Sequence, residues 1–350
     1  MHLVATKTIK AKVVSLTKHK KDLLETEYNN LQHFLQTGED CGVYSANKQQ
    51  ALQLYKTIKS NKEYPISLRK DLIEIEKQDT CIAKYWYRIR VKGCRKLWVA
   101  IKPHQEIPEN IEFCESKIIR RKKEFFVHLT VKKDVPKINP RNVLAVDLGE
   151  RVIATVCGSF DNKKPHFFGR NIRGIRRHYS WLRRRLGEKK ALKTIKKIKD
   201  TEKRKVDDQL NKISRRIVEL AKEHNAMIVL GDLTGIQKQN KGRRMNRIVS
   251  NMPYFKLSQM IEYKAEWYGI PIIKIQEQDT SKICSRCNEF GARQTQGHFK
   301  CDNCGRINFN ADYNGALNIL KRAISFIDIA GVVSEPTQNR TEENLSSKII

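Results

Sequence analysis

Four of the nine cysteines are spaced as metal ligands. Cys284 and Cys287 form one Cys-x2-Cys pair, and Cys301 and Cys304 form a second pair after thirteen intervening residues. Each pair predicts a turn that directs two thiolates to one point, and two such turns complete the tetrahedral four-thiolate site that Zn²⁺ prefers. Because all four ligands come from the protein, no position is left for a reacting water, and we expect a structural zinc ion.

Two aspartates stand where a carboxylate could do chemistry. Asp147 interrupts an otherwise apolar run, and Asp312 lies in the predicted first turn of a helix just after the cysteine cluster. Taken singly, Asp147 could cap a turn, and Asp312 could be an acid that the helix dipole favours. Together, on a basic α/β scaffold, they indicate ligands for Mg²⁺, which activates water and stabilises the leaving oxygen in phosphodiester hydrolysis.

The charge of the chain indicates a polyanionic partner. With 69 Lys and Arg against 38 Asp and Glu, the formal net charge is +31. Nucleic acid is the default partner of such a chain. An anionic membrane surface is the poorer alternative, because no basic amphipathic anchor stands out.

The positive charge is densest between Arg170 and Lys205, where 16 cationic residues accompany three acidic ones. This stretch is either a solvated helix surface or a helical insertion that faces nucleic acid, and the excess of charge favours the second interpretation. The candidate contacts are Arg176, Arg177, Arg183, Arg184, Arg185, Lys189 and Lys190.

The compartment follows from weaker signals. The chain has no run of about 18 apolar residues and no secretory signal, so we expect no membrane partner. An odd number of cysteines in a Lys-rich chain favours a reducing compartment over a disulfide framework. We therefore expect a cytoplasmic, nucleoid-associated protein that is a monomer or a homodimer.

The first 140 residues predict a β-rich unit that helices interrupt. Helical spacing of apolar residues runs from His19 to about Gly38 and from about Ala46 to Ser60. Alternating runs at 85–91 and 97–101 predict a hairpin within a small barrel, with a further strand at 124–131 and a linker at 134–141.

The rest of the chain predicts an α/β layout. Two apolar strands at 143–149 and 152–157 flank a glycine turn. The later elements are a basic helical stretch at 170–205 with a break near Gly187, a helix carrying Val206 to Leu220, a strand at 226–230, a polar loop at 242–247, a helix at 254–268 and a strand at 271–275.

Five ordered motifs resemble one family. They are Val-Leu-Ala-Val-Asp-Leu-Gly at 143–149, Ile-Val-Leu-Gly-Asp-Leu-Thr-Gly-Ile at 228–236, Tyr-Lys-Ala-Glu-Trp-Tyr-Gly-Ile at 263–270, Thr-Ser-Lys-Ile-Cys-Ser-Arg-Cys at 280–287 and Asp-Tyr-Asn-Gly-Ala-Leu-Asn-Ile at 312–319. In this order and spacing, the chain resembles the TnpB (OrfB) proteins of insertion sequences, which are relatives of type V CRISPR effectors. The likeness is close over about residues 140–325 and looser upstream.

The resemblance implies an RNase H-like RuvC nuclease domain with an inserted zinc ribbon, preceded by a β-barrel unit. It also implies a guide RNA from the end of the element and a double-stranded DNA target read by base pairing. It assigns 1–18 and 76–138 to a wedge-like β domain, 19–75 to a helical recognition-like insertion, 139–280 and 306–330 to the RuvC-like domain, 170–225 to its basic helical insertion, 281–305 to the zinc ribbon and 331–350 to a flexible tail.

The resemblance also assigns the catalytic acids. Asp147 matches the first acid and Asp312 the third, but Gly231 occupies the position of the second, a glutamate in the family. The neighbouring Asp232 is not a replacement, because successive strand residues point to opposite faces. The first acid of the family's last motif is also altered, to Asn310.

Three interpretations therefore remain. The chain is an RNA-guided DNA endonuclease, encoded by a transposable element, whose Mg²⁺-dependent cleavage is impaired at Gly231. Alternatively, it is an RNA-guided DNA-binding repressor that no longer cuts, or a general RNA-binding zinc-ribbon protein. A transposase is disfavoured, since no tyrosine or serine recombination motif is evident.

Overall fold

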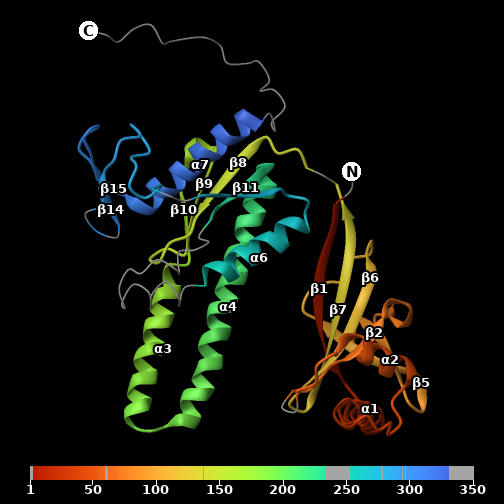
Figure 1. Cartoon of the computed structure of the whole chain (residues 1–350). Helices are drawn as coiled ribbons and strands as arrows, with labels where there is room; N and C mark the ends of the chain where they lie inside the picture. The colour runs from red at the N-terminus through yellow and green to blue at the C-terminus, as the bar shows by residue number, and fades with distance from the viewer. Residues whose placement is uncertain are drawn as a thin grey trace, which may run out of the picture. The chain divides into compact units, whose positions relative to one another are not determined.

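The structure is a computed structural model that describes residues 3–59, 62–136, 138–232, 253–276, 279–293, 295 and 297–330. It divides into two compact units, an N-terminal unit of His2–Val135 and a C-terminal unit from Pro136 onward (Figure 1). The division falls inside the linker expected at 134–141. The polar loop expected at 242–247 and the tail expected from 331 lie outside the described residues. Within the described part of the chain, no helix has the length and apolar character needed to cross a membrane.

The N-terminal unit is built on one seven-stranded antiparallel sheet in the order β2-β6-β7-β1-β5-β4-β3. Its strands are β1 (Leu3–Val14), β2 (Ile66–Arg69), β3 (Glu74–Lys77), β4 (Tyr85–Val91), β5 (Cys94–Pro103), β6 (Glu112–Arg121) and β7 (Glu124–Val135). Only the short 3-10 helix η1 (Lys70–Leu72) and one residue separate the two edge strands, so the edges meet at that turn and the sheet curls.

The predicted hairpin at 85–101 is confirmed as β4 and β5, which pair antiparallel. Burial alternates along β4, so that Tyr85 and Tyr87 lie in the core while Trp86 lies on the other face. The period of two residues along a strand produces this alternation. The two tyrosines are therefore core residues.

Two helices accompany this sheet. Helix α1 (Lys18–Thr37) begins at the capping hydroxyl of Thr17 and ends at Gly38, whose φ of 83° suits glycine. Helix α2 (Ser45–Leu54) is shorter than the predicted 46–60. The expected helical insertion at 19–75 is also too long, because β2 and β3 belong to the sheet and the α-helices of this range end at Leu54. Their apolar residues complete the sheet edges, which helical periodicity could not reveal.

The C-terminal unit contains a five-stranded sheet in the order β10-β9-β8-β11-β12. Its strands are β8 (Asn142–Asp147), β9 (Ala154–Gly158), β10 (His166–Phe168), β11 (Ala226–Asp232) and β12 (Ile272–Gln276), with the 3-10 helix η2 (Asp161–Lys163) between β9 and β10. Strands β8, β11 and β12 run parallel, whereas β8, β9 and β10 are antiparallel neighbours. The predicted α/β layout is confirmed.

Helices cover both faces of this sheet. Helices α4 (Leu192–Glu223) and α6 (Tyr254–Glu266) pack on one face, over Leu144, Val146 and Leu230. Helix α7 (Ala311–Ala330) packs on the other, over Ala145 and Val229. Residues of odd number in β8 and β11 therefore point toward α7, and those of even number point toward α4 and α6.

The basic stretch forms two long helices (Figure 1). Helix α3 (Arg170–Glu188) ends next to the predicted break, and Lys190 in the connection has a φ of 51°. Helix α4 then continues without a second break to Glu223. The prediction of a separate helix that carries Val206 to Leu220 is therefore wrong. Ile198 and Val206 are eight residues apart, about two helical turns, which keeps both on one side of a single helix.

A small third sheet carries the cysteine cluster. It consists of β13 (Ala292–Arg293), β14 (His298–Cys301) and β15 (Arg306–Asn310), paired antiparallel. The expected boundary at residue 305 is one strand too early, because β15 pairs with β14 and belongs to this ribbon. Helix α7 follows β15 directly, which links the ribbon to the five-stranded sheet.

Candidate active site and metal centre

Asp147 and Asp312 meet where β8 ends beneath the first turns of α7. Asp147 is the last residue of β8, and its side chain, like those of the other odd-numbered residues of this strand, points toward α7. A Cβ atom built on Gly315 of α7 would lie 2.8 Å from the Asp147 Oδ2 atom. A Cβ atom built on Gly149, just after β8, would lie 3.8 Å from the Asp312 Oδ1 atom. Glycine at position 315 therefore lets the helix approach the carboxylate closely.

Both carboxylates lie in surroundings that disfavour negative charge. Burial raises the pKa of Asp147, and the nearby negative charge of Asp312 raises it further. Burial also raises the pKa of Asp312, against the opposing effect of the Arg293 guanidinium. Two adjacent carboxylates in such surroundings are stabilised by a cation, so the pair fits a divalent ion, which prefers oxygen ligands.

Arg293 brings a cation from the ribbon to this pair. Its Nη2 atom donates a hydrogen bond of 2.7 Å to the Asp312 Oδ1 atom. Arg293 lies in β13, whereas Asp312 lies in the first turn of α7. Sequence reasoning did not find Arg293, because nothing in its local pattern distinguishes it from the other arginines.

Gly231 lies beside Asp147 in the sheet. Strands β11 and β8 are parallel and pair Leu230 with Val146, so the next residues along each strand are Gly231 and Asp147. Both have the orientation toward α7, whereas Asp232 points to the opposite face. Among the described residues, position 231 is therefore where a third carboxylate would join the two aspartates.

The Asn310 side chain makes a hydrogen bond at the start of α7. Its Oδ1 atom accepts a hydrogen bond of 2.8 Å from the backbone N–H of Tyr313. Asparagine in this arrangement caps the N-terminus of a helix. The residue thus stabilises the start of α7, the turn that carries Asp312.

The four cysteines are brought together as predicted. Their sulfur atoms all lie within 4.8 Å of one another, with 3.6 Å between the Sγ atoms of Cys284 and Cys304 and 3.5 Å between those of Cys287 and Cys301. A tetrahedral Zn²⁺ with bonds of about 2.3 Å places its sulfur ligands roughly 3.8 Å apart. A backbone N–H group, that of Glu289, lowers the pKa of the Cys287 thiol and favours the thiolate that binds metal. The cluster therefore fits zinc.

Two asparagines of α7 hold the ribbon against the acid pair. The Asn314 side chain accepts from the Ser285 N–H at 2.9 Å and donates to the Ile283 carbonyl at 2.7 Å. Asn318, one turn further along, donates to the Ile283 and Thr280 carbonyls. The first cysteine turn is thus fixed to the helix that carries Asp312, and the cysteine cluster and the acid pair form one assembly.

The seven predicted basic contacts divide into two groups. Five are exposed: Arg177, Arg184, Arg185, Lys189 and Lys190. Arg183 instead forms an ion pair with Glu202 of α4. Arg176 is partly buried, and burial lowers the pKa of its guanidinium. The Arg183–Glu202 ion pair joins α3 to α4.

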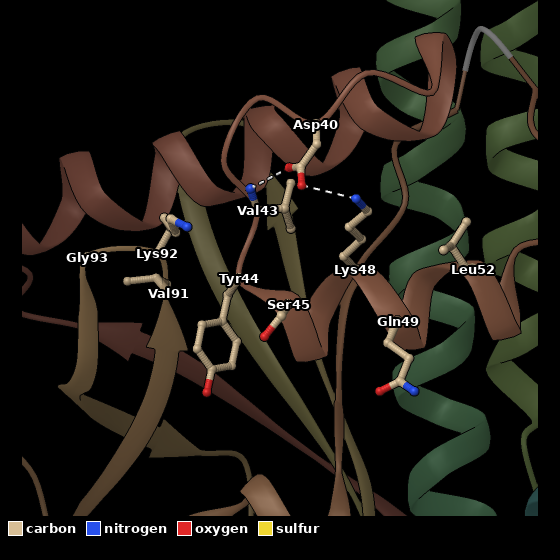
Figure 2. Close-up of a pocket in the computed structure, with 10 residues that line it drawn as sticks. All are labelled: Asp40, Val43, Tyr44, Ser45, Lys48, Gln49, Leu52, Val91, Lys92 and Gly93. Atoms are coloured by element: carbon tan, nitrogen blue, oxygen red, sulfur yellow. Dashed lines mark hydrogen bonds and ion pairs between the residues drawn. The ribbon is translucent and has the colours of Figure 1, made fainter.

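A cavity of about 840 Å³ in the N-terminal unit was not expected from the sequence. Figure 2 shows it at the start of α2, between that helix and the β4–β5 turn. Asp40 lines it, accepting from the Val43 N–H at 3.2 Å and from Lys48 Nζ at 3.0 Å. The Lys48 ammonium lowers the pKa of Asp40 to about 2, so this carboxylate is ionised at neutral pH.

The C-terminal part of the chain is similar to known proteins. The model of the Cas12f1-like TNB domain family matches residues 254–319, which include the four cysteines and Asp312. A TnpB-like protein of Methanocaldococcus jannaschii is 28% identical over 200 residues, which cover 53% of this chain and 72% of the relative. The chain belongs to the TnpB family, related to type V effectors.

Further relatives extend beyond this TnpB-family chain. The CRISPR-associated endodeoxyribonuclease Cas12f1 of Sulfoacidibacillus thermotolerans is 34% identical over 194 residues, which cover 51% of this chain and 44% of that protein. A Cas12f1–sgRNA–target DNA complex has a protein chain with the same fold, at a TM-score of 0.54 and 18% identity. That match covers 79% of this chain and 68% of the Cas12f1 chain.

Proposed function

We propose that this TnpB-family protein is an RNA-guided DNA-binding protein with a RuvC-like, Mg²⁺-dependent endonuclease site, and that Gly231 impairs its cleavage. The observation that carries the proposal is the meeting of Asp147 and Asp312 between β8 and α7. Kinship with TnpB-like proteins and Cas12f endodeoxyribonucleases supports the general function. The β-rich N-terminal unit would be the wedge-like domain, and the C-terminal unit would be the RuvC-like domain with its zinc ribbon.

The acid pair fits one Mg²⁺ ion better than two. Mg²⁺ is typically held by one or two carboxylates together with water and substrate phosphate oxygens. Asp147 and Asp312 can supply the two carboxylates. When bound there, the ion would activate water and stabilise the leaving oxygen of a phosphodiester. A second ion would need the third carboxylate, and Gly231 has no side chain to supply one.

Arg293 has a role in the same site under this proposal. Its guanidinium is 39% exposed and already hydrogen-bonds Asp312, so it can also contact a phosphate that approaches the pair. Asn314 and Asn318 then act as positioning residues, because they fix the ribbon that carries Arg293. The zinc ion would be structural, since the four thiolates leave no open position.

The test begins with the RNA that accompanies the protein. Small RNA co-purified from the host would be sequenced, and RNA from the end of the encoding element is expected. The reconstituted complex would then be assayed for target DNA binding and for Mg²⁺-dependent cleavage, with Asp147→Ala as the control. We expect guide-dependent binding with slow cleavage that Asp147→Ala abolishes. Binding that ignores the guide sequence would contradict the proposal and favour a general RNA-binding protein.

Gly231 also favours a second candidate, a guided DNA-binding repressor without nuclease activity. Both candidates predict guide-dependent binding, and they differ in cleavage. Single-turnover cleavage with excess protein separates them, because it detects a slow reaction that multiple-turnover assays miss. Equal rates for the wild type and Asp147→Ala would support the repressor.

A further inference from the structure

Trp181 is an exposed aromatic residue on the most basic helix of the described chain. Helix α3 has seven arginines and a single acidic residue, Glu188. The Trp181 side chain is 49% exposed, whereas Tyr179 of the same helix is buried. A single exposed ring needs no partner by itself, so its surroundings decide whether it has a binding role.

Trp181 lies in a row of residues along the outward side of α3. Gly174, His178, Trp181 and Arg185 follow one another at intervals of four, three and four residues, which places them on one side of a helix. We call these four residues the outward row. The Arg185 guanidinium lies 5.8 Å from the centre of the Trp181 ring, and the ring of His178 lies 6.3 Å from it.

Gly174 leaves open space at the start of this row. A Cβ atom built there would have no other atom within 4 Å, so packing in the described chain does not require glycine. Glycine is also unfavourable inside a helix. A glycine on an open helix surface allows the backbone of a ligand to come close.

Cations flank the row without acidic partners. Arg177 and Arg184 lie one turn to either side of Trp181 and are exposed. Among the described residues, neither forms an ion pair, whereas Arg173 and Arg183 pair with Glu150 and Glu202. An aromatic ring between cations is the pattern by which proteins hold single-stranded nucleic acid, with the bases stacked and the phosphates paired.

The row leads away from the acid pair. Helix α3 begins at Arg170, whose positive charge acts on Asp312. Trp181 is eleven residues further along, about 16 Å at the helical rise. A strand with one phosphate at the acid pair can therefore continue along α3.

We propose that the DNA strand presented to the acid pair lies, unpaired, along the outward row and stacks a base on Trp181. The proposal rests on the proposed function, because DNA is the strand that the acid pair would cut. It adds a binding residue that acts through stacking and not through charge.

The test measures binding of labelled oligothymidylate to the full-length, zinc-loaded protein without Mg²⁺ and without guide RNA. Trp181→Ala is expected to weaken binding by roughly 5- to 150-fold, the effect of losing one stacked base. Trp181→Phe keeps a ring and should lose much less. Leu192→Ala is the matched control, because Leu192 is 73% exposed on the same helical pair, and it should bind as the wild type does. Oligothymidylate should quench tryptophan fluorescence in the wild type but not in Trp181→Ala.

Salt dependence separates stacking from charge. Trp181→Ala should leave the slope of log K against log salt unchanged, whereas Arg177→Gln with Arg184→Gln should reduce it by about 0.7 per lost contact. Equal affinities for the wild type and Trp181→Ala would overturn the proposal. An equal loss for duplex DNA or oligouridylate would overturn the assignment to single-stranded DNA. Since no cleavage or guide is involved, these outcomes are independent of whether the acid pair cuts.

Discussion

Gly231 of β11 lies beside Asp147 of β8, on the face of the sheet that α7 covers. The parallel pairing of Leu230 with Val146 sets this arrangement. Asp312 lies on the same face, in the first turn of α7. A side chain at 231 would point toward the two aspartates, whereas Asp232 points away from them. Position 231 is therefore where a third carboxylate could join the pair.

Gly231→Glu should increase guided, Mg²⁺-dependent cleavage by roughly two orders of magnitude or more. The glutamate would add the missing ligand, and metal stabilisation of a phosphodiester transition state amounts to several kcal/mol. The measurement is single-turnover cleavage of a target plasmid.

Two variants control this experiment. Gly231→Gln adds a side chain of the same size without charge and should not restore cleavage. Gly231→Glu combined with Asp147→Ala should be inactive if the new acid works through the same ion. Rapid cleavage by the wild type would show that position 231 does not limit the reaction.

Cys284→Ser should remove about one zinc ion per chain and lower the melting temperature, since a structural site contributes folding energy directly. Metal content and thermal unfolding are the measurements. Cys81→Ser is the matched control, because Cys81 is exposed and lies outside the cluster. A wild-type protein that contains no zinc would contradict this assignment.

Asn314→Ala should lower the free energy of unfolding by about 1–3 kcal/mol, because it leaves the buried Ser285 N–H of the ribbon without its acceptor. Hydrogen exchange at the Ser285 amide should also accelerate, since the Asn314 carbonyl protects it. Asn171→Ala, at an exposed position of α3, should change stability by no more than about 0.5 kcal/mol. Unchanged exchange at Ser285 would mean that Asn314 does not hold the ribbon.

Arg183 and Arg184 should behave differently although they are adjacent. Arg183→Ala removes the partner of Glu202 between α3 and α4, so it should lower the melting temperature. Arg184→Ala should leave stability unchanged. It should reduce the magnitude of the slope of log K against log salt for nucleic-acid binding by about 0.7 to 0.9. Thermal unfolding and salt titrations compare the two. Equal effects of both substitutions on binding would indicate that the whole helix, and not its outward side, contacts nucleic acid.

Local patterns in the sequence determined the elements and the ligands. The Cys-x2-Cys spacing predicted the four-thiolate cluster, because two ligands in one short turn need only local geometry. Alternation of apolar residues predicted the β4–β5 hairpin, since the side-chain period of a strand is local as well. The ordered motifs also identified the family and the glycine at the position of its second acid.

Tertiary structure decided which of these residues meet. Arg293 reaches Asp312 only because the ribbon folds back on α7, and Asn314 holds it there through contacts with residues about thirty positions earlier. The same holds for Trp181 and Arg183, which are two residues apart but lie on the outward and inward sides of α3. Such contacts depend on how distant segments pack. The local periodicity of a sequence indicates which face of an element is buried, but it does not indicate which elements pack against that face.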